Sequence, residues 1–396
     1  MKRRNFIKNT GLGAIGTYYV PSFISSLYPT LGDESADKKL IVIQLSGGND
    51  GLNTIIPFEN DVYHQQRPTL RIKKNEVLKT NEMLGFNPVM DSFYNLFQDG
   101  YVSVINSVGY PNPNRSHFRS MDIWQTASNA NEYLKTGWIG RYLDAYCTQN
   151  HAALEIDNQL SLSMQGKEMS GLALTNSNTF YRTLRGNFFD QVIDQAQKTA
   201  LDEDNLGYLY KTLVKTDQSA AYLKENHSIK KNNFDFPKTS LGRKLATVSQ
   251  FIRSGISTEV YYVSHNGFDS HAGQRNQQDR LLSQYSEAVN ALVKSLEKSG
   301  HMNDVLIMTF SEFGRRVEEN ASKGTDHGKA NNLFLISANL NKPGFYNEGP
   351  NLTSLDEGDV SYKIDFRNIY SDVLHDWLGK DSSKIISQSF SSLKII

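Results

Sequence analysis

The stretch Leu40-Ile41-Val42-Ile43-Gln44-Leu45 runs directly into Ser46-Gly47-Gly48-Asn49-Asp50-Gly51-Leu52-Asn53. A short apolar run that ends in turn residues is typical of a strand buried on both faces of a sheet. In open α/β sheets, sites form beyond the carboxyl ends of strands. This stretch therefore predicts an α/β fold, and it marks one edge of the sheet as the place where chemistry is expected.

The same apolar pattern recurs along the chain and is separated by helical patterns. Further strands are predicted at Tyr101–Val108, Glu259–Ser264, Asp304–Phe310 and Asn332–Ser337. Helical spacing of apolar residues predicts helices at Met90–Phe97, Leu241–Ile252 and Gln278–Leu296. Strands that alternate with helices of this length indicate a largely parallel central sheet flanked by helices.

The segment at about 149–239 reads differently from its surroundings. It holds two short β-like pieces, Leu160–Met164 and Gly171–Thr175, followed by polar helical stretches. We interpret it as an insertion or cap on one main domain that spans residues 32–396.

Residues 1–31 read as a targeting segment that is separate from the fold. Lys2, Arg3, Arg4 and Lys8 precede a moderately apolar stretch, and no acidic residue occurs before Asp33. The run Arg3-Arg4-Asn5-Phe6-Ile7-Lys8 resembles the twin-arginine export motif, which a receptor reads. A single membrane helix fits less well, because glycines and Pro21 break the apolar run. We expect export through the twin-arginine machinery, a periplasmic or otherwise extracytoplasmic location, and no transmembrane domain in the mature protein.

The composition excludes several classes of protein. The chain has 396 residues with 42 Lys+Arg and 42 Asp+Glu, so it lacks the basic excess of a nucleic-acid binder. Its single cysteine, Cys147, rules out a disulfide scaffold and any cysteine-based metal cluster. The glycine-rich loop after the first strand lacks both the dinucleotide and the P-loop pattern, and no serine-esterase elbow is present.

Acidic residues and histidines follow each of the strongest predicted strands. The first of these segments is Ser46–Asn53, quoted above. The others are His265-Asn266-Gly267-Phe268-Asp269-Ser270-His271, Ser311-Glu312-Phe313-Gly314-Arg315-Arg316 and Gly324-Thr325-Asp326-His327-Gly328. Each segment alone fits a turn, a helix cap or a local ion pair. Together they predict a divalent-metal site, and mixed Asp, Glu and His ligands suit Zn, Mn or Fe, whereas a mostly carboxylate set suits Ca or Mg. His265 is nearly as good a ligand as His271 on these grounds.

These segments resemble one known family. Together with Ser116-His117-Phe118, Trp124 and Thr136-Gly137-Trp138-Ile139-Gly140-Arg141, they are similar to domain-of-unknown-function family 1501 of exported bacterial proteins. That family is placed by similarity in the alkaline phosphatase/sulfatase-like superfamily, metal-dependent hydrolases and mutases of phosphate and sulfate esters. The resemblance covers about residues 38 to 380 and implies an alkaline-phosphatase-like fold.

The resemblance also implies a ligand set. Asp269, His271 and His327 match one complete metal position of the superfamily, to be filled by Zn, Mn or Ca. Asp50 and Glu312 match a second position, which lacks its histidine because Phe313 stands in that place. Arg315 is expected to grip the anionic group of the substrate, since its planar fork matches phosphate or sulfate oxygens.

The nucleophile of the superfamily has no clean match. The equivalent position falls at His117, next to Ser116. Three catalytic arrangements are open: Ser116 is the nucleophile if the register slips by one, His117 forms a phospho-adduct or donates a proton, or metal-bound water attacks directly. In the non-catalytic alternative, Ser116 only caps the helix that begins at His117.

The sequence thus predicts an exported metal-dependent hydrolase of a phosphate or sulfate ester, either a small molecule or a polymer. The alternative is a non-catalytic exported binding or assembly protein that retains the fold and one structural metal.

Overall fold

The computed structural model describes residues 38–184, 191, 205–227 and 234–396, and these residues form the basis of everything below. The predicted export signal at 1–31 lies outside them. No helix in the described ranges is both long and apolar enough to cross a membrane.

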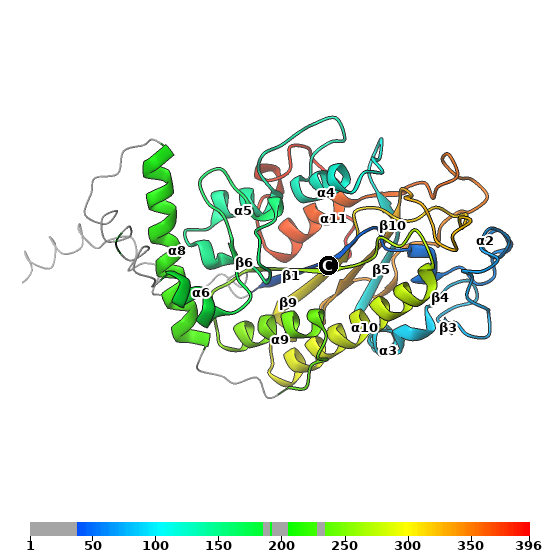
Figure 1. The fold of residues 1–396 in the computed structure, drawn as a ribbon, viewed down its shortest axis with the longest axis horizontal. Coiled ribbons are helices and arrows are strands. Elements are labelled where there is room, and N and C mark those ends of the chain that lie inside the picture. The colour runs from blue at the N-terminus through cyan, green and yellow to red at the C-terminus, as the bar shows by residue number, and fades with distance from the viewer. Residues whose placement is uncertain (1–37, 185–190, 192–204, 228–233) are drawn as a thin grey trace, which may run out of the picture. The chain divides into compact units, whose positions relative to one another are not determined.

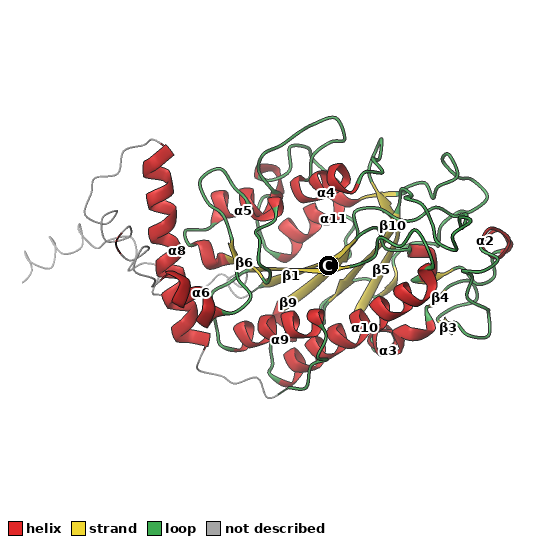
Figure 2. Cartoon of the chain, viewed as in Figure 1, coloured by secondary structure: helices red, strands yellow, loops and turns green. Residues whose placement is uncertain are grey.

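One large sheet organises the described part of the chain (Figure 2). Its nine strands follow the order β11-β5-β10-β9-β1-β8-β6-β7, with β12 paired to β5. The strands are β1 (Lys39–Ser46), β5 (Val102–Gly109), β6 (Ala153–Glu155), β7 (Leu172–Ala173), β8 (Val260–Asn266), β9 (Val305–Phe310), β10 (Asn331–Ile336), β11 (Gly344–Phe345) and β12 (Ile364–Asp365). A smaller sheet has the order β2 (Ile55–Ile56), β4 (Gly85–Phe86), β3 (Leu78–Lys79).

Helices cover both faces of the large sheet (Figure 1). The described α-helices are α2 (Asp61–Gln66), α3 (Asp91–Gln98), α4 (His117–Thr126), α5 (Trp138–Tyr146), α6 (Ser177–Leu184), α8 (Asn205–His227), α9 (Ser240–Arg253), α10 (Gln274–Lys298) and α11 (Phe366–Asp372). On β1, Ile41 and Ile43 pack in the core shared with α3, α9 and α10. Leu40 and Val42 face the other way, into the core shared with α4, α5 and α11. Alternate side chains of one buried strand therefore support two cores, as its continuous apolar pattern predicts.

The predicted α/β class with a largely parallel, helix-flanked sheet is confirmed. β1 pairs in parallel with β8 and β9, and each predicted strand and helix appears within a few residues of its expected bounds. β10 is the exception in direction, since it runs antiparallel to both β5 and β9. The chain between β9 and β10 forms no crossover helix, which a parallel return would need.

The segment 149–239 is only partly an added layer. β6 pairs in parallel with β8, and β7 with β6, so its first part extends the main sheet. The expected β-like piece Leu160–Met164 instead contains the 3-10 turn Leu162–Met164. Ala153 and Leu154 are fully buried, which explains why this part joins the sheet. Residues 185–190, 192–204 and 228–233 of the predicted insertion lie outside the described residues.

Candidate metal centre

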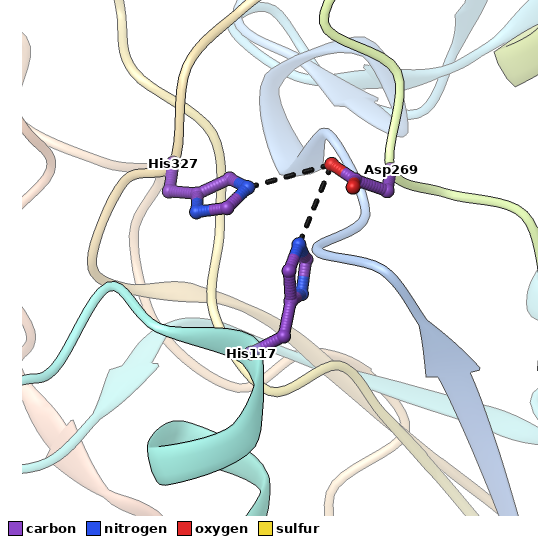
Figure 3. Close-up of side chains that lie close together, drawn as sticks. All are labelled: His117, Asp269 and His327. Carbon is purple, nitrogen blue, oxygen red and sulfur yellow. Dashed lines mark hydrogen bonds and ion pairs between the residues drawn. The ribbon is translucent and has the colours of Figure 1, made fainter.

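Three imidazole rings converge on one carboxylate oxygen beyond the carboxyl end of β8, and Figure 3 shows two of them, His117 and His327, beside Asp269. Oδ1 of Asp269 lies 3.4 Å from Nε2 of His117, 3.1 Å from Nε2 of His271 and 3.4 Å from Nε2 of His327. Asp269 and His271 follow β8, His117 is the first residue of α4, and His327 lies between β9 and β10. In the described chain, ligand atoms of His117, Asp269 and His327 lie within 4.8 Å of one another.

The other ring nitrogen of each histidine contacts a hydrogen-bond acceptor. Nδ1 of His117 lies 2.9 Å from Oε1 of Glu312, and Nδ1 of His271 lies 3.3 Å from Oδ1 of Asp326. Nδ1 of His327 lies 2.7 Å from the carbonyl oxygen of Arg115. Because these partners only accept, we assign the ring proton to Nδ1 in all three histidines.

The Nε2 atoms then present lone pairs to one another and to Asp269. Nε2 of His271 and Nε2 of His327 are 2.9 Å apart, and Nε2 of His117 is buried without a hydrogen-bond partner among the described residues. Acceptor atoms gathered in this way are satisfied by a shared proton or by a shared metal ion. Ring nitrogens held from behind by a carboxylate or carbonyl are the usual arrangement of metal-ligating histidines. The residues therefore fit a divalent metal.

The chemistry of the donors favours some metals over others. Three imidazole nitrogens and one carboxylate oxygen suit Zn or Mn. Ca takes six to eight oxygen ligands, so of the predicted metals it fits this set least well.

Glu312 supports the cluster from behind. Its carboxylate is 1% exposed, and Oε1 accepts hydrogen bonds from His117 and from the backbone N–H of Gly47 at 2.8 Å. This hydrogen bond raises the pKa of His117 against the opposing effect of burial. Burial lowers the pKa of His327, which keeps that ring neutral and able to ligate. In this geometry Glu312 orients His117, and its role as a metal ligand stays a prediction.

Arg315 lies beside the cluster, but its guanidinium is engaged with the protein. It donates to the carbonyl oxygen of Gly48 at 2.7 Å, to that of Thr325 at 2.9 Å and to Oδ1 of Asp269 at 2.9 Å. Burial is the largest influence on the pKa of Asp269 and raises it, but the hydrogen bond and charge of Arg315, together with the contributions of His327 and His117, outweigh burial and hold that pKa at about 2. Arg315 is 2% exposed and donates from all three nitrogens to protein acceptors, which positions Asp269, and its grip on a substrate anion stays a prediction.

Asp50 is not brought to the cluster. Its Oδ2 accepts from Arg67 at 2.6 Å in an ion pair whose side chains are 0% and 1% exposed. Arg67 also donates to the carbonyl oxygens of Val317, at 2.9 Å, and Arg316, at 2.8 Å. The predicted second metal position of Asp50 and Glu312 therefore does not assemble: a guanidinium neutralises one carboxylate, and hydrogen-bond donors satisfy the other.

The remaining predicted residues separate in the same way. Ser116 occupies the N-cap of α4 without a side-chain capping bond, and its side chain is exposed. His265 is buried and contacts the carbonyl oxygen of Leu281 at 3.1 Å, so it packs against α10 and not in the cluster. The ring of Phe313 packs against His117 and His327, with centroids 4.8 Å and 4.7 Å away. It supplies an apolar wall beside the cluster.

A turn of acidic residues joins the loops that carry the histidines. Asp359 is fully buried and pairs with Arg115, whose carbonyl accepts from His327, and with Arg316 at 3.3 Å. Lys329 pairs with Asp356 at 2.7 Å. Sequence reasoning missed this turn, as it missed Arg67, because ion pairs between distant segments leave no local signal. Asp326, by contrast, could have been found from the sequence, because it stands directly before His327.

A cleft of about 400 Å³ opens onto the cluster. Its lining residues come from the ends of β1 and β8, from α4 and from the cluster itself: Gln44, Ser46, Gly47, His117, Phe118, Met121, Asn266, Gly267, Asp269 and Glu312. Gly47 has φ +117°, and a Cβ there would stand 2.3 Å from the backbone nitrogen of Asp269. Glycine at this position lets the two strand ends approach closely.

Comparison with known proteins identifies one family and several solved structures of low similarity. The family described as "Protein of unknown function (DUF1501)" matches residues 100–388. No curated protein matches the chain.

Among solved structures, similar ones include a phosphonate monoester hydrolase from Silicibacter pomeroyi (8% identity, 87% of this chain and 74% of that chain, TM-score 0.40). Others are the sulfatase PsFucS1 from Pseudoalteromonas sp. (10%, 87% and 68%, 0.39) and an alkaline phosphatase superfamily protein from Vibrio parahaemolyticus (8%, 89% and 71%, 0.39). At such low similarity the chemistry has to be derived from this chain's own residues.

Proposed function

The chain belongs to the DUF1501 family, and we propose that it is an extracytoplasmic metal-dependent hydrolase of phosphate or sulfate esters. One observation carries this proposal: acceptor atoms of His117, Asp269, His271 and His327 converge where a cleft of about 400 Å³ opens. A metal ion with a purely structural role would not need a cleft through which a substrate reaches it.

His117, Asp269, His271 and His327 would hold the ion. A divalent ion supplies Lewis-acid polarisation of the ester oxygen. Glu312 fixes the ring of His117 so that Nε2 faces Asp269, and Arg315 fixes Asp269. Both keep ligands in place before the substrate arrives, which is the protein's main contribution to such catalysis.

Water is the nucleophile in this proposal. Ser116 does not line the cleft, and Nε2 of His117 points toward Asp269. Water adds to phosphorus or sulfur, the bond to the ester oxygen breaks, and the products are an alcohol and phosphate or sulfate.

Metal content and activity test the proposal together. The full chain is assayed with 4-nitrophenyl phosphate and 4-nitrophenyl sulfate after loading with Zn, Mn or Ca. We expect bound metal and turnover that tracks it, and loss of both in His327→Ala and His271→Ala. His375→Ala is the matched control, since that imidazole is 73% exposed and pairs with Asp376. Equal activity in all three variants would contradict the proposal.

A second candidate is a non-catalytic binding or assembly protein with one structural metal. Four protein ligands around one ion is the arrangement of structural sites, whereas catalytic sites keep an open position. X-ray absorption of the Zn-loaded protein separates the two candidates. Four protein ligands, with no exogenous oxygen and no turnover of any ester, would favour this one.

We propose that the chain is exported through the twin-arginine machinery, because Arg3 and Arg4 match its recognition motif. Replacing both with Lys is expected to leave the folded protein in the cytoplasm of a bacterial host, and immunoblots of periplasmic and cytoplasmic fractions measure this. Unchanged periplasmic protein would count against the twin-arginine route.

A further inference from the structure

The cleft beside the metal cluster has two chemically different walls. β1 turns from apolar to polar along one face, where Leu40 and Val42 are followed by Gln44 and Ser46. Ser46 pairs in parallel register with Asn266 of β8, so both side chains stand on that same face. Amide and hydroxyl groups therefore form one wall of the cleft.

The amide of Gln44 is held in position. Its side chain is 4% exposed, and its Oε1 accepts a hydrogen bond from the hydroxyl of Tyr262. With the oxygen engaged from below, the two N–H groups remain to donate into the cleft that Gln44 lines. A buried and oriented donor of this kind is what gives a pocket its specificity.

The opposite wall is apolar and comes from the first turn of α4. Phe118 and Met121 stand three residues apart and so lie side by side on the helix. Phe118 is 87% exposed, although it is a large aromatic residue next to a metal ligand. Exposure of this apolar ring to water is unfavourable, whereas a flat ligand could stack on it.

Charge narrows the class of ligand further. None of the described residues that line the cleft is Lys or Arg, and its two carboxylates are already engaged, Asp269 by Arg315 and Glu312 by His117. The part of a ligand that lies beyond the metal is therefore uncharged, with hydrogen-bonding groups on its edge and an apolar face.

We infer that the cleft binds a neutral polyhydroxylated ring that carries the ester, the chemistry shared by sugars and cyclitols. The edge hydroxyls meet Gln44, Ser46 and Asn266, and the C–H face lies on Phe118. This inference rests on the proposed function for the position of the ester beside the metal, and on the cleft alone for the ring.

Kinetics with matched esters test the inference. Glucose 6-phosphate and glucose 6-sulfate are compared with myo-inositol 1-phosphate and with n-butyl phosphate and sulfate, which have neither ring nor hydroxyls. We expect kcat/KM at least about tenfold higher for a ring ester than for the butyl ester, and the sugar and inositol arms identify the source.

Variants locate the effect. Phe118→Ala is expected to lower kcat/KM for the ring ester by about three- to tenfold through KM, with the metal Kd unchanged. Gln44→Glu keeps the oxygen that accepts from Tyr262, removes both N–H donors, and is expected to lose the ring preference. Tyr133→Ala is the control, because that aromatic ring is also exposed, at 76%, and does not line the cleft.

The outcomes separate the two proposals. Hydrolysis of nitrophenyl esters with no preference for ring esters, and no effect of Phe118→Ala, would overturn the inference and leave the function standing. If no ester is hydrolysed, binding of glucose 6-phosphate and myo-inositol 1-phosphate is measured by saturation-transfer NMR. Binding that Phe118→Ala weakens would then support the inference against the function, and absence of binding would overturn both.

Discussion

Glu312 accepts the Nδ1 hydrogen of His117 at 2.9 Å while it is itself 1% exposed. The relationship joins the end of β9 to the first turn of α4, two segments almost two hundred residues apart. Because Glu312 raises the pKa of His117, protonation and metal binding compete at Nε2 of that ring.

Glu312→Gln is expected to weaken metal binding by about ten- to a hundredfold, the usual cost of losing a partner behind a ligating histidine. Competitive titration with a chelating dye measures the Kd. Glu287→Gln, on the exposed side of α10, serves as control. An unchanged Kd would show that Glu312 does not support the ligand set.

Arg67→Met is expected to lower the free energy of unfolding by about 3–5 kcal/mol, because it leaves the buried carboxylate of Asp50 without its cation. Urea denaturation measures the change. Arg275→Met breaks the more exposed Arg275–Asp279 pair and is expected to cost less than about 1 kcal/mol. Equal effects of the two substitutions would refute the assigned role of Arg67.

Stability is expected to fall between pH 4 and pH 7 because of Glu155. Burial raises its pKa to about 7, against a hydrogen bond from the N–H of Ser161. The folded state therefore holds this proton more tightly than the unfolded state, so the stabilisation is complete below about pH 4.3 and is lost as the pH rises through 7. The difference is about 3 kcal/mol, and Glu155→Gln should remove that part of the pH dependence in urea titrations. Parallel pH profiles for the two proteins would contradict this.

His151 is expected to act in the opposite direction. Burial lowers its pKa to about 4, and its ring contacts the hydroxyls of Ser219 and Ser257 and stacks on Tyr222 of α8, with centroids 4.5 Å apart. The stabilisation is complete above about pH 6.5 and is lost as the pH falls through 4, by about 3 kcal/mol. The protection factors of the Ser219–Leu223 amides, which correct exchange for the intrinsic effect of pH, should fall at low pH, and His151→Gln should remove that fall. Protection factors that stay constant between pH 7 and pH 4 would exclude the effect.

Local sequence determined the elements of this fold. Apolar runs and helical spacing identified β1, β5, β8, β9 and β10 and the helices α3, α9 and α10, because the periodicity of burial is written into neighbouring residues. It also determined which segments carry chemistry. Asp269, His271 and His327 follow strand ends, and those ends meet at one edge of a parallel sheet.

Tertiary structure decided what each of those side chains does. Asp50 and Glu312 are both carboxylates after predicted strands, yet one meets Arg67 and the other meets His117. Tertiary structure also determined the direction of β10, which pairs antiparallel with β9 because the connection between these strands forms no crossover helix. The physical reason is the same in each case: a side chain's partner is set by distant segments that folding brings together, and no local pattern records that proximity.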